Sequence, residues 1–217
     1  ALHRYALEQR QLHSWATPER LGCFAFIEGD TRLLAAFASG FALYDPDSGR
    51  LQWLDRCEPA GSGRRFNDGR VDRQGRFWAG TMVEDAAVAG PYSAALYCLG
   101  ADGRAQPRET GVGIANGLCW SPDGHTLYFA DSPRHAIYAY DFDVDSGRIG
   151  NRRQFARTGP GVEPDGSCVD AEGCLWNAQW GAGRVLRYAP DGRVLETLET
   201  PGALQPTCVA FAGPALD

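Results

Sequence analysis

The chain has 217 residues, of which 44% are hydrophobic and 22% charged, a composition that argues against a disordered protein. Its length suits a single domain over residues 1–217, or at most two small ones. Its formal net charge is −6 and it carries no basic stripe, so we expect no nucleic-acid partner. No apolar run approaches the roughly 18 residues of a membrane helix and no signal peptide is visible, so we expect no membrane partner either.

A first repeated unit is a polar turn with a glycine, followed by a short apolar strand. Its glycines are residues 29, 75, 124 and 173, at intervals of 46 to 49 residues. The strands that follow them are predicted at residues 32–36, 76–80, 127–130 and 174–178. A period of this length is typical of proteins built from repeated structural units.

A second unit alternates with the first along the chain. It consists of a strand, an Asp-Gly or Ser-Gly turn and another strand, which is the pattern of a β-hairpin. Copies lie at residues 41–51, 95–103, 136–148 and 184–194, and a further copy opens the chain at residues 2–5. One full repeat therefore contains about four short strands and no convincing helix.

Four strands in under 50 residues are typical of a β-propeller blade. A β-sandwich is the alternative, but a sandwich has no reason to repeat both hairpins at a fixed period. The chain opens within a blade and ends at residues 207–211, which read as the inner strand of another. Because an open ring leaves sheet edges exposed, we expect an all-β propeller fragment of about four to five blades, truncated at both ends.

Polar residues precede three of the predicted inner strands, at the end of a propeller where a site is assembled. The segments are residues 65–69, 115–117 and 163–166. The amide oxygen of Asn116 and the carboxylate of Asp165 suit a hard divalent cation, and Arg65 suits a polar substrate. The alternative is that these are turn residues, chosen because they tolerate a left-handed backbone.

Other catalytic signatures are missing from the sequence. It has no His-Glu-x-x-His, Gly-x-Ser-x-Gly or phosphate-loop motif, and its four histidines fall at predicted turns or strand ends. It has seven cysteines and no Cys-x-x-Cys. An odd number of cysteines argues against a disulfide framework, so we expect buried thiols and a cytoplasmic location.

Long motifs of the chain resemble the SMP-30/gluconolactonase/regucalcin family. They lie at residues 65–82, 116–121, 128–132, 150–153, 164–166, 170–173 and 183–185. The resemblance implies a six-bladed propeller with one divalent metal ion near its axis, which could be Ca, Zn, Mn or Mg. It also implies either a lactonase or a non-catalytic, calcium-binding protein.

The resemblance also assigns roles to individual residues. Asn116 and Asp165 match metal ligands, and Asp165 matches the proton donor and acceptor. Arg65 and Asn67 match contacts to the sugar lactone, and Asp85 stands where relatives usually have a glutamate contact. A further ligand, a glutamate near the N-terminus, has no match in this chain.

Together these features predict a metal-dependent hydrolase that opens a sugar lactone to the aldonic acid. A non-catalytic calcium-binding protein would use the same ligands without turnover. A protein-binding propeller and an organophosphate hydrolase are further alternatives. The sequence names neither the sugar, nor the metal, nor the oligomeric state.

Overall fold

The computed structural model describes residues 1–213, whose regular secondary structure is almost entirely antiparallel sheet. The chain opens with a two-stranded hairpin, β1 (Leu2–Ala6) and β2 (Gln11–Trp15). The first four-stranded sheet contains β3 (Leu21–Phe26), β4 (Leu33–Phe37), β5 (Gly40–Tyr44) and β6 (Leu51–Asp55). The second contains β7 (Arg64–Val71), β8 (Phe77–Val83), β9 (Ala94–Leu99) and β10 (Ala105–Val112).

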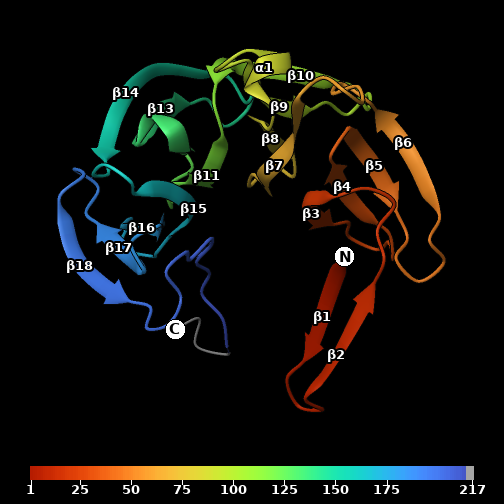
Figure 1. Ribbon diagram of the computed structural model, residues 1–217, viewed down its shortest axis with the longest axis horizontal. Coiled ribbons are helices and arrows are strands. Elements are labelled where there is room, and N and C mark those ends of the chain that lie inside the picture. The colour runs from red at the N-terminus through yellow and green to blue at the C-terminus, as the bar shows by residue number, and fades with distance from the viewer. Residues whose placement is uncertain (214–217) are drawn as a thin grey trace.

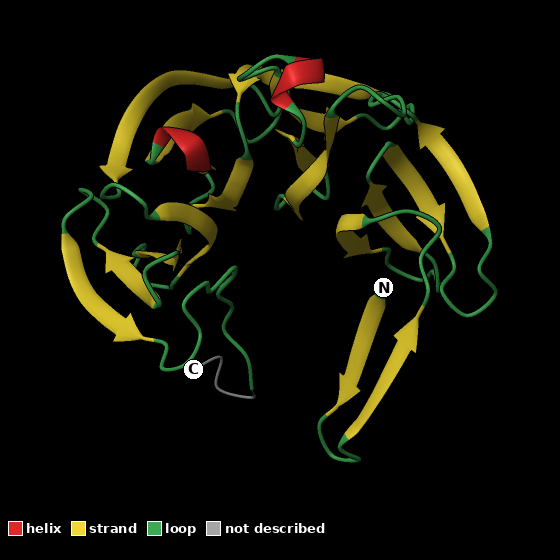
Figure 2. Cartoon of the chain, in the orientation of Figure 1, coloured by secondary structure: helices red, strands yellow, loops and turns green. Residues whose placement is uncertain are grey.

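Two further sheets repeat the same up-and-down order. The third contains β11 (Ala115–Trp120), β12 (Thr126–Asp131), β13 (Ala136–Phe142) and β14 (Ile149–Arg157). The fourth contains β15 (Glu163–Val169), β16 (Leu175–Trp180), β17 (Arg184–Tyr188) and β18 (Val194–Glu199). The described helices are one turn each, α1 (Ala86–Ala89) and the 3-10 turn η1 (Ser132–Arg134) (Figure 2). The predicted all-β class is confirmed.

The four sheets follow one another in an arc, with the first strand of each nearest the middle (Figure 1). These inner strands touch in sequence, β3 against β7, β7 against β11 and β11 against β15. The predicted repeats match the sheets, because each repeated glycine lies in the turn between the first and second strands. Gly75, Gly124 and Gly173 have φ of 81°, 79° and 82°, a backbone region that favours glycine.

The core lies mainly between neighbouring sheets. Trp78 of β8 is fully buried, and its ring packs edge-on against Trp120 and at a tilt against Phe142, both of the third sheet. Leu96, Leu118 and Phe129 belong to the same cluster. Trp78 and Trp120 therefore pack one repeat against the next.

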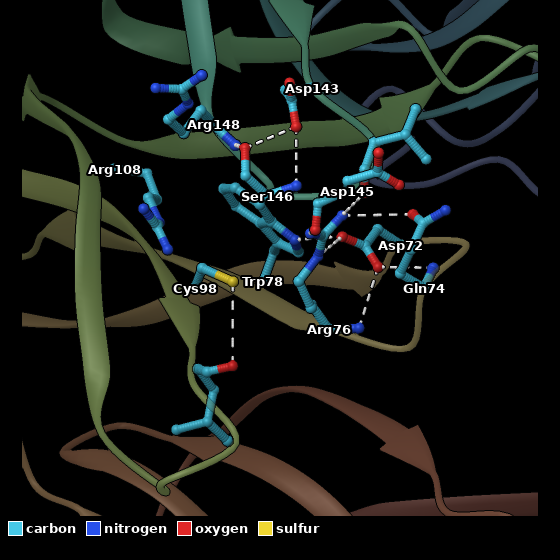
Figure 3. Close-up of polar contacts among 12 residues, drawn as sticks. Asp72, Gln74, Arg76, Trp78, Cys98, Arg108, Asp143, Asp145, Ser146 and Arg148 are labelled. Carbon is cyan, nitrogen blue, oxygen red and sulfur yellow. Dashed lines mark hydrogen bonds and ion pairs between the residues drawn. The ribbon is translucent and has the colours of Figure 1, made fainter.

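A polar contact joins the same two sheets at their turns (Figure 3). The Asp72 carboxylate accepts hydrogen bonds from Nε of Arg76 at 2.6 Å and from Nε1 of Trp78 at 3.0 Å. The same guanidinium donates to the carbonyl oxygens of Val144 and Asp145 at 2.7 and 3.0 Å. Arg76 thus fastens the β7–β8 turn of the second sheet to the β13–β14 turn of the third.

Residues 207–211, predicted as an inner strand, belong to no strand in the structure. The segment nevertheless runs beside β15, because the Gly166 amide donates to the Thr207 carbonyl at 2.8 Å. Phe211 packs edge-on against Trp176 of β16. No described strand lies on the other side of this segment to complete a ladder, which is why its apolar pattern does not become a strand here.

Candidate functional site

A cavity of about 660 Å³ lies where the inner strands begin. Its described lining comes from β7, β11, β15 and their neighbours: Gly22, Arg65, Asn67, Asp68, Met82, Ile114, Asn116, Glu163, Asp165, Gly166, Trp180, Thr207 and Cys208. The sequence-predicted residues Arg65, Asn67, Asn116 and Asp165 are all among them. These four residues span 100 positions of the chain and meet at one place.

A β-bulge at the start of each inner strand aims these side chains. In β7, residues 67 and 68 lie opposite one residue of β8, between the pairs Phe66–Thr81 and Gly69–Ala79. The pairing of β11 with β12 shifts in the same way after Asn116, and that of β15 with β16 shifts after Pro164. A bulge bends its strand and redirects its side chains. The Asn-Gly and Asp-Gly pairs therefore sit in bulges within strands, rather than in loops between them.

A chain of hydrogen bonds connects the predicted residues. Nη1 of Arg65 donates to Oδ1 of Asn67 at 3.3 Å, and Nδ2 of Asn67 donates to Oδ1 of Asn116 at 3.0 Å. Nδ2 of Asn67 also donates to the Ala115 carbonyl at 3.0 Å. Both amide protons of Asn67 are thus used within the protein, so Asn67 meets a ligand only through its Oδ1.

Arg65 is held from a second direction by an acidic residue. Its Nε donates to Oε1 of Glu84 at 3.0 Å, and Glu84 also pairs with Arg20, which directly precedes β3. Its Nη1 donates in addition to the Phe66 carbonyl at 3.0 Å. With its side chain only 18% exposed, the guanidinium is preorganised, and its remaining N–H groups are available to a polar ligand.

Carboxylates dominate the electrostatics of the cavity. Burial and the nearby charge of Asp68 raise the pKa of Asp165 to about 7, against a hydrogen bond from the Gly166 amide that lowers it. Burial also raises the pKa of Asp68, although the charge of Arg70 opposes this. Among the described lining residues Arg65 is the one cation, against the three carboxylates of Asp68, Glu163 and Asp165. A desolvated site in which carboxylates outnumber the arginines fits a divalent cation.

Asp68 lines the cavity as well, although it had no predicted role beyond its place in the segment 65–69. It precedes Gly69 as Asn116 precedes Gly117 and Asp165 precedes Gly166. This shared position before glycine was the signal that could have identified it. Its Oδ1 accepts from the Gly69 amide at 2.9 Å, and its Oδ2 faces the Leu118 amide of the next sheet at 3.4 Å.

Asp85, predicted as a substrate contact, is not brought to the cavity lining. Its Oδ1 accepts from the Ala87 amide at 3.0 Å, so it caps the N-terminus of α1. Aspartate is favoured at that position because its side chain satisfies a free helix N–H. The residue before it, Glu84, is the one that reaches Arg65.

A different group, Asp170, Glu172 and Cys174, also places three ligand atoms within 4.8 Å of one another. These residues form the turn between β15 and β16. Asp170 accepts from the Cys174 amide, from Nε1 of Trp176 and from Nε of Arg187, and Arg187 also pairs with Glu172. Arg187 already pairs with both carboxylates, so this group is explained as a structural turn.

None of the helices in the described part of the chain, residues 1–213, has the length and apolar character needed to cross a membrane.

Comparisons with known proteins agree on one family. The model of the SMP-30/Gluconolactonase/LRE-like region matches residues 1–217. The 6-deoxy-6-sulfogluconolactonase of Pseudomonas putida is 40% identical over 215 residues, which cover 98% of this chain and 72% of that protein. The L-arabinolactonase of Azospirillum brasilense is 40% identical over 218 residues, 98% of this chain and 70% of that protein. Human regucalcin is 41% identical over 153 residues, 69% of this chain and 51% of that protein.

Solved structures of similar proteins point the same way. A calcium-binding regucalcin from Agrobacterium tumefaciens superposes with a TM-score of 0.89 at 35% identity, over 99% of this chain and 71% of that chain. A luciferin-regenerating enzyme gives a TM-score of 0.89 at 31% identity, over 98% of this chain and 73% of that chain. A gluconolactonase from Xanthomonas campestris gives a TM-score of 0.66 at 28% identity, over 88% of this chain and 65% of that chain.

Proposed function

The chain belongs to the SMP-30/gluconolactonase/LRE-like family, and we propose that it hydrolyses a sugar lactone to the aldonic acid with one divalent metal ion bound in the cavity. The observation that carries this proposal is the meeting of Asn116, Asp165, Arg65 and Asn67 around one cavity. Relatives at 40% identity over almost the whole chain are lactonases. We also propose that the four sheets belong to a six-bladed propeller. We further propose a cytoplasmic location, because the seven free cysteines suit a reducing compartment.

The metal ligands that this chain supplies are Oδ1 of Asn116 and the carboxylate of Asp165. Asp68 adds negative charge beside them. Ca, Mn, Mg and Zn all accept such oxygen donors. When bound, the cation would polarise the lactone carbonyl and stabilise the negative charge that develops on its oxygen.

Asp165 is the group that moves the proton. As a carboxylate it accepts a proton from the water that attacks the carbonyl carbon, and a bond forms between that carbon and the water oxygen. The bond from the same carbon to the ring oxygen then breaks, and Asp165 returns the proton to the ring oxygen. In the metal-free protein, burial and the charge of Asp68 raise the pKa of Asp165 to about 7, and a bound cation would lower that pKa and so favour the carboxylate that accepts the proton.

Arg65 and Asn67 orient the sugar. The free N–H groups of Arg65 donate to lactone oxygens, and Oδ1 of Asn67 accepts from a hydroxyl. Both side chains are held by the protein before the substrate arrives, so little conformational entropy is lost when it binds.

A pH-stat assay with gluconolactone and arabinolactone tests the proposal. We expect turnover in Ca²⁺, Mn²⁺, Mg²⁺ or Zn²⁺ that EDTA abolishes. Binding of Ca²⁺ without turnover of any lactone would instead support the non-catalytic alternative, which the similarity to a calcium-binding regucalcin favours. Turnover that is equal with and without EDTA would refute the role of the metal.

A further inference from the structure

Ser132 is a buried hydroxyl that the proposed mechanism does not use. It lies at the start of η1, directly after β12, and is 1% exposed. Its Oγ donates to the Pro164 carbonyl at 2.8 Å and accepts from Nδ2 of Asn116 at 2.9 Å. It therefore touches both Asn116 and the residue that precedes Asp165.

The direction of these hydrogen bonds follows from simple counting. A carbonyl oxygen only accepts, so the single proton of the Ser132 hydroxyl goes to Pro164. The serine oxygen is then left as an acceptor towards Asn116, and the atom of Asn116 that faces it must be the amide nitrogen. Oδ1 of Asn116 is thereby turned towards the cavity.

Asn67 defines the same orientation from the other side. One proton of its amide goes to the Ala115 carbonyl and the other to Oδ1 of Asn116. An amide oxygen has two lone pairs, so Oδ1 of Asn116 keeps one for a ligand in the cavity. Two independent neighbours therefore agree on which end of the Asn116 amide is presented.

We propose that Ser132 is a positioning residue, which holds the oxygen end of the Asn116 amide towards the cation and ties β11 to the backbone beside Asp165. Without the hydroxyl, the buried Asn116 Nδ2 and the Pro164 carbonyl both lose their partners. A buried amide without a partner is driven to rotate or to admit water. This inference rests on the proposed metal site.

Calorimetric titration of Ca²⁺ and Mn²⁺ into metal-free protein tests the inference. Ser132→Ala should bind the cation about 10- to 100-fold more weakly, the usual effect of losing a group that orients a ligand. Ser132→Thr keeps the hydroxyl and should bind within about threefold of wild type. The matched control is Ser39→Ala, which removes a buried hydroxyl bonded to Glu19 outside the cavity and should leave affinity unchanged.

The decisive comparison repeats Ser132→Ala in an Asn116→Asp background. A carboxylate presents oxygen at both ends, so it needs no partner to select one. If Ser132 orients the amide, its loss should weaken binding in the Asn116 protein and change it by less than about threefold in the Asn116→Asp protein. Equal losses in both backgrounds, or no loss in either, would show that Ser132 has only a structural role.

A measurement without metal separates this inference from the proposed function. In a ¹⁵N–¹H spectrum, the side-chain amide signal of Asn116 is assigned by its disappearance in Asn116→Asp. Ser132→Ala should shift that signal and speed its exchange with water. An unchanged signal overturns the inference. Wild-type protein that binds no cation overturns the metal-dependent function instead, while the amide signal still decides the role of Ser132.

Discussion

Replacing Asp165 with asparagine keeps the shape of the side chain and removes its charge. Burial and the charge of Asp68 raise the pKa of Asp165 from 3.8 to about 7, a shift of about three units. Each unit is worth about 1.4 kcal/mol, so the ionised carboxylate costs the metal-free fold about 4 kcal/mol. Asparagine avoids this cost, and its Oδ1 is still able to accept from the Gly166 amide, as Asp165 does at 2.9 Å.

The pH dependence of this effect has a definite sign. Between pH 3.8 and about 7 the native protein keeps the Asp165 proton that the unfolded chain has released. The stability of the wild type therefore falls as pH rises through this range, and the loss is complete above about pH 7. In EDTA, Asp165→Asn should be more stable than wild type by about 4 kcal/mol at pH 8 and equal to it near pH 4.

Urea unfolding in EDTA at pH 4, 6 and 8 measures this difference, with lactone turnover measured in parallel. Turnover of Asp165→Asn should fall by about 10²- to 10⁴-fold, because asparagine cannot accept the proton. Asp170→Asn is the control. Burial raises the pKa of Asp170, but hydrogen bonds from Trp176 and Arg187 outweigh it and lower that pKa, so this variant should lose stability at pH 8. Equal stability of Asp165→Asn and wild type at pH 8, with turnover intact, would refute the reasoning.

Three further outcomes are expected. Cation affinity should be about tenfold weaker at pH 6 than at pH 8, because protons compete for Asp165; calorimetry at the two pH values checks this, and a flat profile contradicts it. Arg65→Ala should raise KM for the lactone roughly 10- to 100-fold and leave calcium affinity within about twofold, and an equal loss of both would assign Arg65 to the metal site instead. Arg76→Ala should lower the free energy of unfolding by about 3 kcal/mol in urea titrations, because it leaves the buried Asp72 carboxylate without its cation. An unchanged unfolding midpoint would show that Arg76 does not stabilise the contact between the second and third sheets.

Local sequence was enough to predict most elements of the fold, although residues 207–211 form no strand. Turn glycines such as Gly75 and Gly124 require a positive φ, and the short apolar runs after them pair with their nearest neighbours in the chain. Both signals act over a few residues, so they are visible without knowing the tertiary structure. The repeated Asn-Gly and Asp-Gly pairs likewise located Asn116 and Asp165, because each repeat brings the same position to the same place.

Only the tertiary structure decided how those residues are used. The partners of Asn116 are Asn67 of the sheet before it and Ser132 of η1, and neither pairing follows from sequence spacing. The raised pKa of Asp165 depends on burial and on Asp68, which lies almost 100 residues away in the chain. Asp85 caps α1 instead of lining the cavity. Hydrogen-bond partners and desolvation depend on which strands become neighbours, and a local pattern does not encode that.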